Sequence, residues 1–548
     1  MTPRTTLVVG AGAAGAALAA RLSADPDHRV VVIEAGDVPR TTDEFPPELL
    51  DASTVQGAMP GHPANWSYLG HLTPDLPYTI ARGRIIGGSS TINGGYFVRA
   101  RPDDFARWAD AAGPEWRYDD VLPVLRDLEH DLDLGAGPFH GDAGPIPVRR
   151  ASQQNPAAQA FTAAALELGF AAEPDKNAPG EPGVGPVPQN VVDGVRINTG
   201  IAYLNPVRDR PNLEVIGGCR VLRVLFDGRH ATGVEVLDAG RGGGRRVIEG
   251  DEVVLCAGGI GTPHLLLVSG IGPAADLGEH GVAVVVDRPG VGRAFSDHPD
   301  ISVGWRARID VVDPDAPETF TTALNLASTE GGGDDLEIMV CVTTMGHLLT
   351  GSGGLVAGGA RSALRHPLAT VRALRGASMR RVRQQAAHGR DLTLLVGLQR
   401  EEARGSITLE SADPTVPPRI DYRYLSTQGD RERMRRGIRT AVALLRTRAF
   451  ADLFDRLTEL DDATLDDDTA LDAWMLAHLG TAIHLCGSAP MGRPSDPAAV
   501  VDAFGRVHGV SGLRVADTSM LPDAPSRGPA ATAVLIGELV ARFIRRGD

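Results

Sequence analysis

The N-terminal part of the chain arranges its apolar positions in a pattern that predicts a strand, a helix and a second strand. Residues 6–9 form a short apolar run, residues 16–23 are rich in Ala and Leu, and residues 29–33 form another apolar run that ends at Glu34. A glycine-rich turn follows the first run: Gly10-Ala11-Gly12-Ala13-Ala14-Gly15. The order strand, G-x-G-x-x-G, helix, strand and acid is typical of a Rossmann dinucleotide-binding unit.

Each position of this motif has a physical role in binding a dinucleotide. Gly10 permits a tight turn, Gly12 lets a pyrophosphate approach the backbone, and Gly15 lets the helix and strand pack closely. The phosphates would then face free N–H groups at the positive end of the helix dipole. Glu34 can accept hydrogen bonds from ribose hydroxyls and would repel a 2′-phosphate. The motif alone does not distinguish FAD from NAD.

Apolar runs in the second half of the chain predict further elements. Residues 392–398 and 405–409 have the composition of strands, and we expect both in an antiparallel sheet that forms the wall facing the cofactor. Residues 471–479 predict a helix. Another helix should open at Pro529, because proline is favoured in the first helical turn.

A basic segment interrupts this otherwise acidic chain. Residues 361–390 contain eight arginines and no Asp or Glu, with apolar residues spaced as in an amphipathic helix. Such a helix could dock on an anionic membrane surface, or receive an acidic partner or substrate. A solvated helical face is the simpler interpretation, and it is the one we favour.

Length and composition narrow the class of protein. A chain of 548 residues exceeds what one hydrophobic core normally holds, so we expect two domains, or a nucleotide-binding domain with a substrate domain woven into it. The content of 43% hydrophobic and 22% charged residues indicates a globular protein. The net charge of −15 argues against a nucleic-acid partner, whose phosphates require Lys and Arg.

Cysteine usage and hydropathy bear on the location of the protein. The four cysteines are too scattered for a disulfide framework, and none has the CxxC spacing of a zinc or iron–sulfur site. We therefore expect no metal and a reducing cytoplasm. The apolar run from Leu7 to Leu22 imitates a secretory signal, but its glycines have the spacing of a binding motif. No other segment reaches the ~20 apolar residues of a transmembrane helix, so we expect none.

Longer motifs resemble the glucose–methanol–choline (GMC) oxidoreductases. The two long signatures of that family are similar to Arg82-Gly83-Arg84-Ile85-Ile86-Gly87-Gly88-Ser89-Ser90-Thr91-Ile92-Asn93-Gly94 and Gly261-Thr262-Pro263-His264-Leu265-Leu266-Leu267-Val268-Ser269-Gly270-Ile271-Gly272. Later motifs of the family match Asp297-His298-Pro299, Thr481-Ala482-Ile483-His484 and Leu513-Arg514-Val515-Ala516-Asp517. The matches occur in family order, and the resemblance implies FAD-dependent oxidation of an alcohol.

The same resemblance implies an α/β fold of two interwoven parts. A Rossmann-type FAD-binding domain would comprise residues 1–150, 205–300 and 485–548. A substrate-binding domain with an antiparallel sheet would comprise residues 151–204 and 301–484. We therefore expect each part to be assembled from segments that are distant along the chain.

The resemblance also assigns cofactor contacts around the first long signature. The backbone N–H groups of Gly87, Gly88 and Ser89 would approach the pyrophosphate and the flavin, and Asn93 would lie near the flavin. Ile80 stands where choline oxidase, a relative, has a histidine that bonds covalently to the flavin. Because isoleucine cannot form that bond, we expect non-covalent FAD.

Further cofactor contacts are implied for the rest of the chain. Val221 would meet the adenine through its backbone, and Ala516 and Asp517 would lie beside the ribityl chain and pyrophosphate. Thr532 falls in the first turn of the helix predicted to open at Pro529. In the family this helix directs its positive end toward the flavin, where its dipole would stabilise an anionic reduced ring.

His484 is the candidate catalytic base. An alcohol that gives up a hydride must also lose its hydroxyl proton, and histidine has a pKa suited to accepting it near neutral pH. We interpret His298 as structural and His508 as a surface or supporting residue.

The position opposite the base departs from the family pattern. The family usually has a second His or Asn there, and the aligned residue here is Ala530, which cannot hydrogen-bond an alkoxide. Ser526 and Arg527 lie close in sequence and are candidate substrate contacts. Arg527 could pair with an anionic part of a substrate, or it could have a structural or solvated role.

Sequence details near the C-terminus are similar to the GMC flavoprotein of the mycofactocin system, an actinobacterial redox-cofactor pathway. They are His484-Leu485-Cys486-Gly487-Ser488-Ala489-Pro490-Met491-Gly492 and Pro525-Ser526-Arg527-Gly528-Pro529-Ala530-Ala531-Thr532. They imply a mycofactocinol dehydrogenase that passes electrons to a respiratory acceptor, a role that peripheral membrane contact through the basic segment at residues 361–390 would suit. The alternatives are a choline-type alcohol dehydrogenase, an oxidase that uses O₂, an FAD-containing hydroxynitrile lyase and a non-catalytic electron shuttle.

Overall fold

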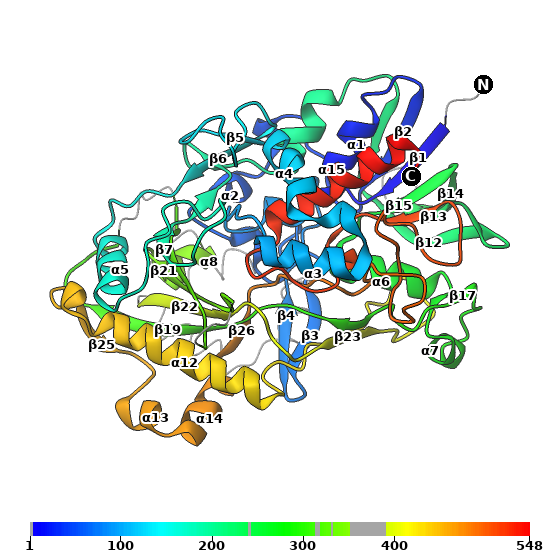
Figure 1. Cartoon of the computed structure of the whole chain (residues 1–548). Helices are drawn as coiled ribbons and strands as arrows, with labels where there is room; N and C mark the ends of the chain where they lie inside the picture. The colour runs from blue at the N-terminus through cyan, green and yellow to red at the C-terminus, as the bar shows by residue number, and fades with distance from the viewer. Residues whose placement is uncertain (1–3, 239–242, 313–317, 330–332, 351–390) are drawn as a thin grey trace.

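The computed structural model describes residues 4–238, 243–312, 318–329, 333–350 and 391–548 (Figure 1). The basic segment at residues 361–390, for which the sequence predicts an amphipathic helix, lies outside the described residues. Among the described residues, no helix combines the length and the apolar character needed to cross a membrane.

A parallel sheet of five strands forms the nucleotide-binding half. Its strand order is β11 (Leu213–Ile216), β2 (His28–Ile33), β1 (Arg4–Val9), β15 (Glu252–Leu255) and β27 (Leu513–Val515). Helix α1 (Ala13–Leu22) follows β1, so the predicted Rossmann unit is confirmed. The strands come from three distant parts of the chain, because the segments between them build the other half.

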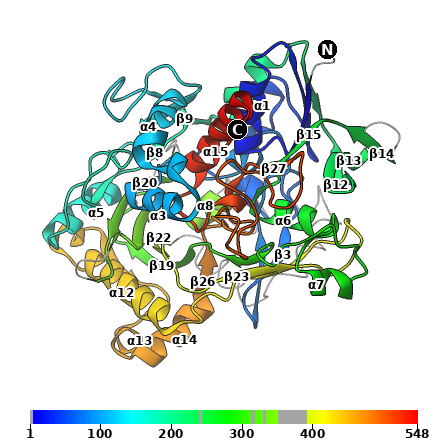
Figure 2. The ribbon, with the colours of Figure 1, turned by 45° about the vertical axis from the view of Figure 1, so that its right-hand side comes forward.

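The C-terminal helix α15 (Ala530–Arg546) lies beside α1 in both views (Figures 1 and 2). The two helices cross closely at Gly537, where a Cβ atom would lie 2.2 Å from the carbonyl oxygen of Ala14. The helix begins directly after Pro529, as predicted, and ends at Gly547, which adopts the left-handed conformation (φ 83°) typical of a helix C-terminus.

A large antiparallel sheet forms the other half. Its order is β25 (Phe454–Leu457), β19 (Pro299–Ala307), β22 (Leu392–Leu398), β21 (Leu336–Cys341), β20 (Phe320–Leu326) and β7 (Val184–Pro186), with β26 (Leu479–Thr481) also paired to β19. Helix α12 (Gln428–Leu445) packs against β22 and β21 (Figure 1). Along these strands the side chains alternate between the two faces of the sheet, and the apolar residues on one face pack toward α12. The opposite sheet face borders a cavity.

A third sheet contains the strand at residues 405–408, and this corrects one prediction. Its order is β18 (Arg293–Phe295), β23 (Gly405–Thr408), β24 (Arg419–Asp421), β3 (Tyr68–Thr73) and β4 (Leu76–Ile80). Residues 392–398 form β22 as predicted, but β23 does not join the same sheet. The backbone N–H groups of Glu402 and Ala403 donate to the Asp430 carboxylate, which holds the connection in a turn. The sheet a strand joins depends on such tertiary contacts, and its own apolar pattern does not specify them.

Further elements surround these sheets. They are α3 (Pro102–Ala112), α4 (Tyr118–Asp127), β5 (Glu129–Asp131), β6 (Ile146–Arg150), α5 (Pro156–Glu167), β12 (Cys219–Asp227), β13 (His230–Asp238), β14 (Gly244–Glu249), α6 (Gly258–Val268), α7 (Ala274–Glu279), α8 (Met345–Thr350), α13 (Asp462–Asp466) and α14 (Asp468–His478). Helix α14 corresponds to the helix predicted at residues 471–479.

Two hydrophobic cores lie on either side of the cavity. One surrounds the parallel sheet and draws its residues from the N-terminal, central and C-terminal parts of the chain. The other surrounds the large sheet and α12. Leu72 and Ile80 of the third sheet belong to this second core, although they fall within residues 1–150 of the predicted FAD-binding domain. The predicted domain boundaries stay a prediction.

Candidate active site

A cavity of about 700 Å³ runs between the parallel sheet and the large sheet. Ligand-binding cavities commonly have volumes in this range. The glycine-rich turn after β1 lies at one end, and the open face of β19, β21 and β22 lies at the other. Of the predicted site residues, the cavity is lined by Gly10, Gly12, Glu34, Gly88, Ser89, Asn93, Val221, His484, Asp517 and Ala530.

Two backbone segments approach each other closely at the nucleotide end. A Cβ atom on Gly88 would lie 2.7 Å from the Cα atom of Gly12, and Gly88 has a positive φ of 54°. A Cβ atom on Gly10 would lie 2.6 Å from the Cys256 carbonyl oxygen. Only glycine allows this arrangement, which leaves bare backbone facing the cavity. Such a surface fits a pyrophosphate, whose oxygens are bound by backbone N–H groups.

Three helices begin at the cavity wall. Gly12 precedes α1, Ala257 precedes α6, and Pro529 precedes α15, and all three residues line the cavity. The free N–H groups and dipoles of helix N-termini favour negative charge. The cavity therefore fits a group that carries phosphates and a ring that becomes anionic on reduction, as FAD does.

Two buried carboxylates bind backbone groups around the nucleotide end. Glu34 accepts the N–H groups of Ala11 and Gly36, both at 2.9 Å. Burial raises the pKa of Glu34 to about 7, against the effect of these hydrogen bonds. Asp517 accepts the Gly258 N–H at 2.8 Å and the Thr262 hydroxyl at 2.6 Å. Each carboxylate thus fixes a loop that borders the cavity, and their predicted contacts to ribose and pyrophosphate stay predictions.

His484 lies deep in the cavity on a strained backbone segment. The preceding residue, Ile483, has a φ of 63°, which is rare for a β-branched residue. Arg82 donates to the Ile483 carbonyl at 2.7 Å, and the His484 N–H donates to Asp297 at 2.6 Å. These two contacts engage both polar groups of the peptide bond between Ile483 and His484, and so hold the imidazole in place.

The imidazole of His484 contacts a second imidazole. Its Nδ1 lies 2.9 Å from Nδ1 of His298, and the two rings meet at 85°. Burial, and after it the neighbouring His298 and Arg82, lower the pKa of His484 well below its ordinary value. Burial also lowers the pKa of His298 to about 4. Both rings are therefore neutral near pH 7, and a neutral imidazole can accept a proton.

Several predicted residues do not line the cavity. Gly15, Gly87, Ala516 and Thr532 lie behind its wall, where Gly87 donates its N–H to the Ala11 carbonyl at 2.8 Å. Gly15 supports the turn, because a Cβ atom there would lie 2.0 Å from the Gly10 carbonyl oxygen.

The two candidate substrate contacts also lie away from the cavity surface. The Ser526 hydroxyl donates to buried Asp104 at 3.0 Å. Arg527 is fully buried and pairs with Glu173 at 3.1 Å and Asp334 at 2.7 Å. These contacts indicate structural roles and do not support direct contact with a substrate.

Sequence reasoning missed four residues of the cavity region. His298 was interpreted as structural, yet its ring touches His484; its position in an Asp-His-Pro motif of the family was the available signal. Arg82 opens the first long signature, but the signature itself does not indicate that this side chain supports the base. Tyr96 and Glu337 line the cavity and share a hydrogen bond of 2.8 Å, but no local motif marks either of them.

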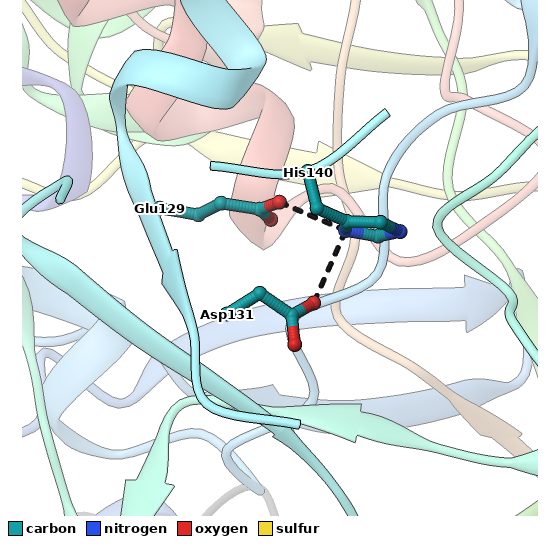
Figure 3. Close-up of side chains that lie close together, drawn as sticks. All are labelled: Glu129, Asp131 and His140. Atoms are coloured by element: carbon teal, nitrogen blue, oxygen red, sulfur yellow. Dashed lines mark hydrogen bonds and ion pairs between the residues drawn. The ribbon is translucent and has the colours of Figure 1, made fainter. Parts of the chain in front are cut away.

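A separate cluster outside the cavity brings together Glu129, Asp131 and His140, as Figure 3 shows. The His140 ring lies 3.0 Å from Glu129, 3.1 Å from Asp131 and 2.7 Å from Asp175. Arg99 and Arg150 pair with Glu129 and Asp131, each at 2.5 Å. Three carboxylates thus face three cationic groups. The cluster is a balanced ion-pair network, and nothing in it points to a metal ion.

This network should make the stability of the protein depend on pH. Although burial opposes it, hydrogen bonds to Asp131 and Asp175 raise the pKa of His140 to about 10. A raised histidine pKa stabilises the fold fully below the unfolded value of 6.5, and that stability is lost as the pH rises toward 10. In urea denaturation, His140→Gln should therefore cost most stability at low pH and progressively less at alkaline pH. A cost that stays constant with pH would contradict this assignment.

Comparisons with known proteins agree with the geometry. The GMC oxidoreductase family matches the chain over residues 5–300 and 401–537. A GMC-type oxidoreductase from Rhodococcus erythropolis is 41% identical over 98% of this chain and 97% of its own length. An oxygen-dependent choline dehydrogenase from Rhizobium rhizogenes is 33% identical over 98% of this chain and 95% of its own.

Solved structures share the whole fold. The crystal structure of pyridoxine 4-oxidase from Mesorbium loti superposes with a TM-score of 0.84 at 29% identity, over 99% of each chain. A formate oxidase has the same fold with a TM-score of 0.84 at 24% identity. The chain therefore belongs to the GMC oxidoreductase family: it is an FAD-dependent oxidoreductase that acts on CH–OH donors.

Proposed function

We propose that the chain oxidises a primary alcohol to an aldehyde, with His484 as the base that takes the hydroxyl proton. The observation that carries this proposal is the neutral, half-buried imidazole of His484 in the wall of the cavity. No hydrogen bond engages its Nε2 among the described residues, so this nitrogen is available to a substrate. FAD, when bound, supplies the acceptor for the hydride that leaves the carbinol carbon.

The contact with His298 influences which ring nitrogen of His484 carries the proton. Of two neutral rings that meet through Nδ1, one donates and the other accepts. The Pro525 and Gln399 carbonyl groups favour a proton on the His298 ring against the effect of burial, although no hydrogen bond engages its Nε2 among the described residues. If that proton sits on Nε2 of His298, His484 donates from Nδ1 and its Nε2 keeps a free lone pair. This tautomer is the one a general base requires.

The proposal extends to the electron acceptor and to the alcohol that donates the hydride. Relatives include a protein named as an oxygen-dependent choline dehydrogenase and another named as an oxidase, so O₂ and a choline-type alcohol are both candidates. The narrower proposal of mycofactocinol as donor, with a respiratory acceptor, rests on the C-terminal sequence details alone.

Non-covalent FAD is supported by Ile80, which is fully buried and has no group to bond a flavin. A cytoplasmic location stays a prediction.

Anaerobic mixing of the FAD-loaded protein with candidate alcohols, including choline and mycofactocinol, tests the proposal. The flavin absorbance should bleach with at least one alcohol, and one aldehyde should form per flavin reduced. Admission of air then separates an oxidase, which releases peroxide, from a dehydrogenase, which stays reduced until another acceptor is added. A flavin that remains oxidised with every alcohol, while a hydroxynitrile is cleaved, would identify a lyase and contradict the proposal.

A further inference from the structure

The open face of the large sheet places a carboxylate in the cavity. Strand β21 alternates, so Leu336 and Ile338 enter the second core while Glu337 between them faces the other way. Glu337 lines the cavity and is only 7% exposed. A carboxylate in so enclosed a position needs partners that stabilise its charge.

Among the described residues, the hydrogen-bond partners of Glu337 all bind one of its two oxygens. Its Oε2 accepts the Tyr96 hydroxyl at 2.8 Å and the Asn325 side-chain N–H at 3.0 Å. No hydrogen bond engages Oε1 within the part of the chain that the structure describes. One oxygen therefore fixes the carboxylate in place, and the other remains free to accept a hydrogen bond.

A buried cation stands directly behind this carboxylate. Lys176, the single lysine of the chain, is 1% exposed and donates to Asn325 Oδ1 at 2.9 Å. It also donates to Glu173 at 2.6 Å and to the Gly183 carbonyl at 3.0 Å. The Asn325 amide accepts from Lys176 and donates to Glu337, so its orientation is fixed and it joins the two charges.

Arg527 completes this network from the far side. Its guanidinium is fully buried and contacts Glu173 at 3.1 Å and Asp334 at 2.7 Å. Glu173 thereby lies between two cations, Arg527 and Lys176. Breaking such a buried network by removing one partner costs much more than an exposed ion pair contributes. Its placement behind Glu337 suggests a role beyond packing.

Tyr96 connects Glu337 to the reaction centre. A Cβ atom on Gly528 would lie 3.4 Å from the Tyr96 ring and 3.5 Å from Cε1 of His484. The tyrosine ring and the imidazole thus flank the same glycine. Since the Tyr96 hydroxyl donates to Glu337, Tyr96 links the carboxylate to the glycine that the base also borders.

We propose that Glu337 anchors the substrate: its free oxygen accepts an N–H or O–H from an alcohol that carries a second hydrogen-bond donor, while Asn325 and Lys176 are positioning residues that hold the carboxylate. This inference rests on the proposed alcohol oxidation and names the substrate class. An alcohol without a second donor leaves the carboxylate unpaired in an enclosed cavity, so the site discriminates against it.

The test compares alcohols of equal length with the FAD-loaded protein. For the wild type, kcat/KM for a diol or an amino alcohol should exceed that for the simple alcohol by about 10- to 100-fold, the worth of a hydrogen bond to a charged group. In Glu337→Gln this ratio should fall mainly through a rise in KM for the donor-bearing alcohol. A larger fall for the amino alcohol identifies an ammonium as the anchored group, and an equal fall identifies a hydroxyl. A ratio that Glu337→Gln leaves unchanged would overturn the proposal.

Lys176→Met tests the positioning role, with the neutral diol as substrate. Burial lowers the pKa of Lys176 to about 8, against the attraction of Glu173. In the wild type the preference for the diol should therefore weaken as the pH rises through that value, and in Lys176→Met it should be weak at every pH. A preference in Lys176→Met that still follows pH as in the wild type would contradict the role of Lys176.

Binding measured separately from turnover keeps the two proposals apart. Perturbation of the oxidised flavin spectrum by an unreactive donor-bearing analogue reports occupancy of the cavity without chemistry. If no alcohol reduces the flavin, the proposed oxidation fails. If the flavin is reduced but the analogue binds Glu337→Gln as tightly as the wild type, only the anchor fails.

Discussion

Replacing His484 by alanine should slow flavin reduction by the alcohol about 10²- to 10⁴-fold, the usual contribution of general acid–base catalysis. The imidazole is half-buried, neutral and in the cavity wall, and it is the group assigned to take the hydroxyl proton. FAD should still bind, because the glycine surface and the three helix N-termini are unaffected. Anaerobic stopped-flow spectroscopy of the FAD-loaded variant measures the loss directly.

A second histidine provides the matched control for this variant. His508 does not line the cavity, and its ring contacts the Gly492 carbonyl at 3.2 Å. In His508→Ala the alcohol should reduce the flavin at the wild-type rate. That result would show that removal of a histidine does not by itself slow the reaction. Rapid flavin reduction in His484→Ala would mean that another group takes the proton.

The second large effect concerns the nucleotide end of the cavity. Gly88→Ala should weaken FAD binding by roughly 10- to 100-fold, the cost of overpacking a tight contact. Its Cβ atom would lie 2.7 Å from Gly12, at a positive φ that disfavours any side chain. Fluorescence titration of the apoprotein with FAD measures the affinity.

Gly278→Ala is the control for the glycine substitution. Gly278 lies exposed in α7, and a Cβ atom there meets no atom within 4 Å. This variant should bind FAD with wild-type affinity. Unchanged affinity in Gly88→Ala would show that the pyrophosphate does not lie on the backbone surface formed by Gly12 and Gly88.

The sequence predicted the nucleotide half of the fold well because that half depends on local rules. Gly10, Gly12 and Gly15 stand at a fixed spacing within one turn, and Glu34 follows at a fixed distance in the same unit. This spacing makes the motif recognisable in the sequence, although the contacts that require Gly10 and Gly12 come from the distant Cys256 and Gly88. The same applies to Pro529, which marks the start of α15.

The substrate half could not be predicted in the same way, because its contacts join distant segments. β22 and β23 have equally strand-like sequences, yet they belong to different sheets. The position of Arg527 near Ala530 leaves a substrate contact open, but its partners Glu173 and Asp334 come from other parts of the fold. Charge pairs of this kind have no signature along the chain.

The candidate site contains residues that a local motif identifies and residues that only the fold brings together. His484 was found through a motif, whereas its contact with His298 depends on two loops 186 residues apart. Glu337 lies within an apolar strand, and only the alternation of that strand between core and cavity explains its direction. Ala530 lines the cavity as the resemblance implied, and it leaves the position of the usual second His or Asn without a hydrogen-bonding side chain.

A crystal structure of the FAD-loaded protein would show directly how His484 lies relative to the flavin. We expect the isoalloxazine ring to lie in the cavity with the His484 imidazole over its reactive edge, and Nδ1 of His484 to keep its contact with His298. A structure in which the His484 ring points away from the flavin, or in which the ring binds outside this cavity, would contradict it.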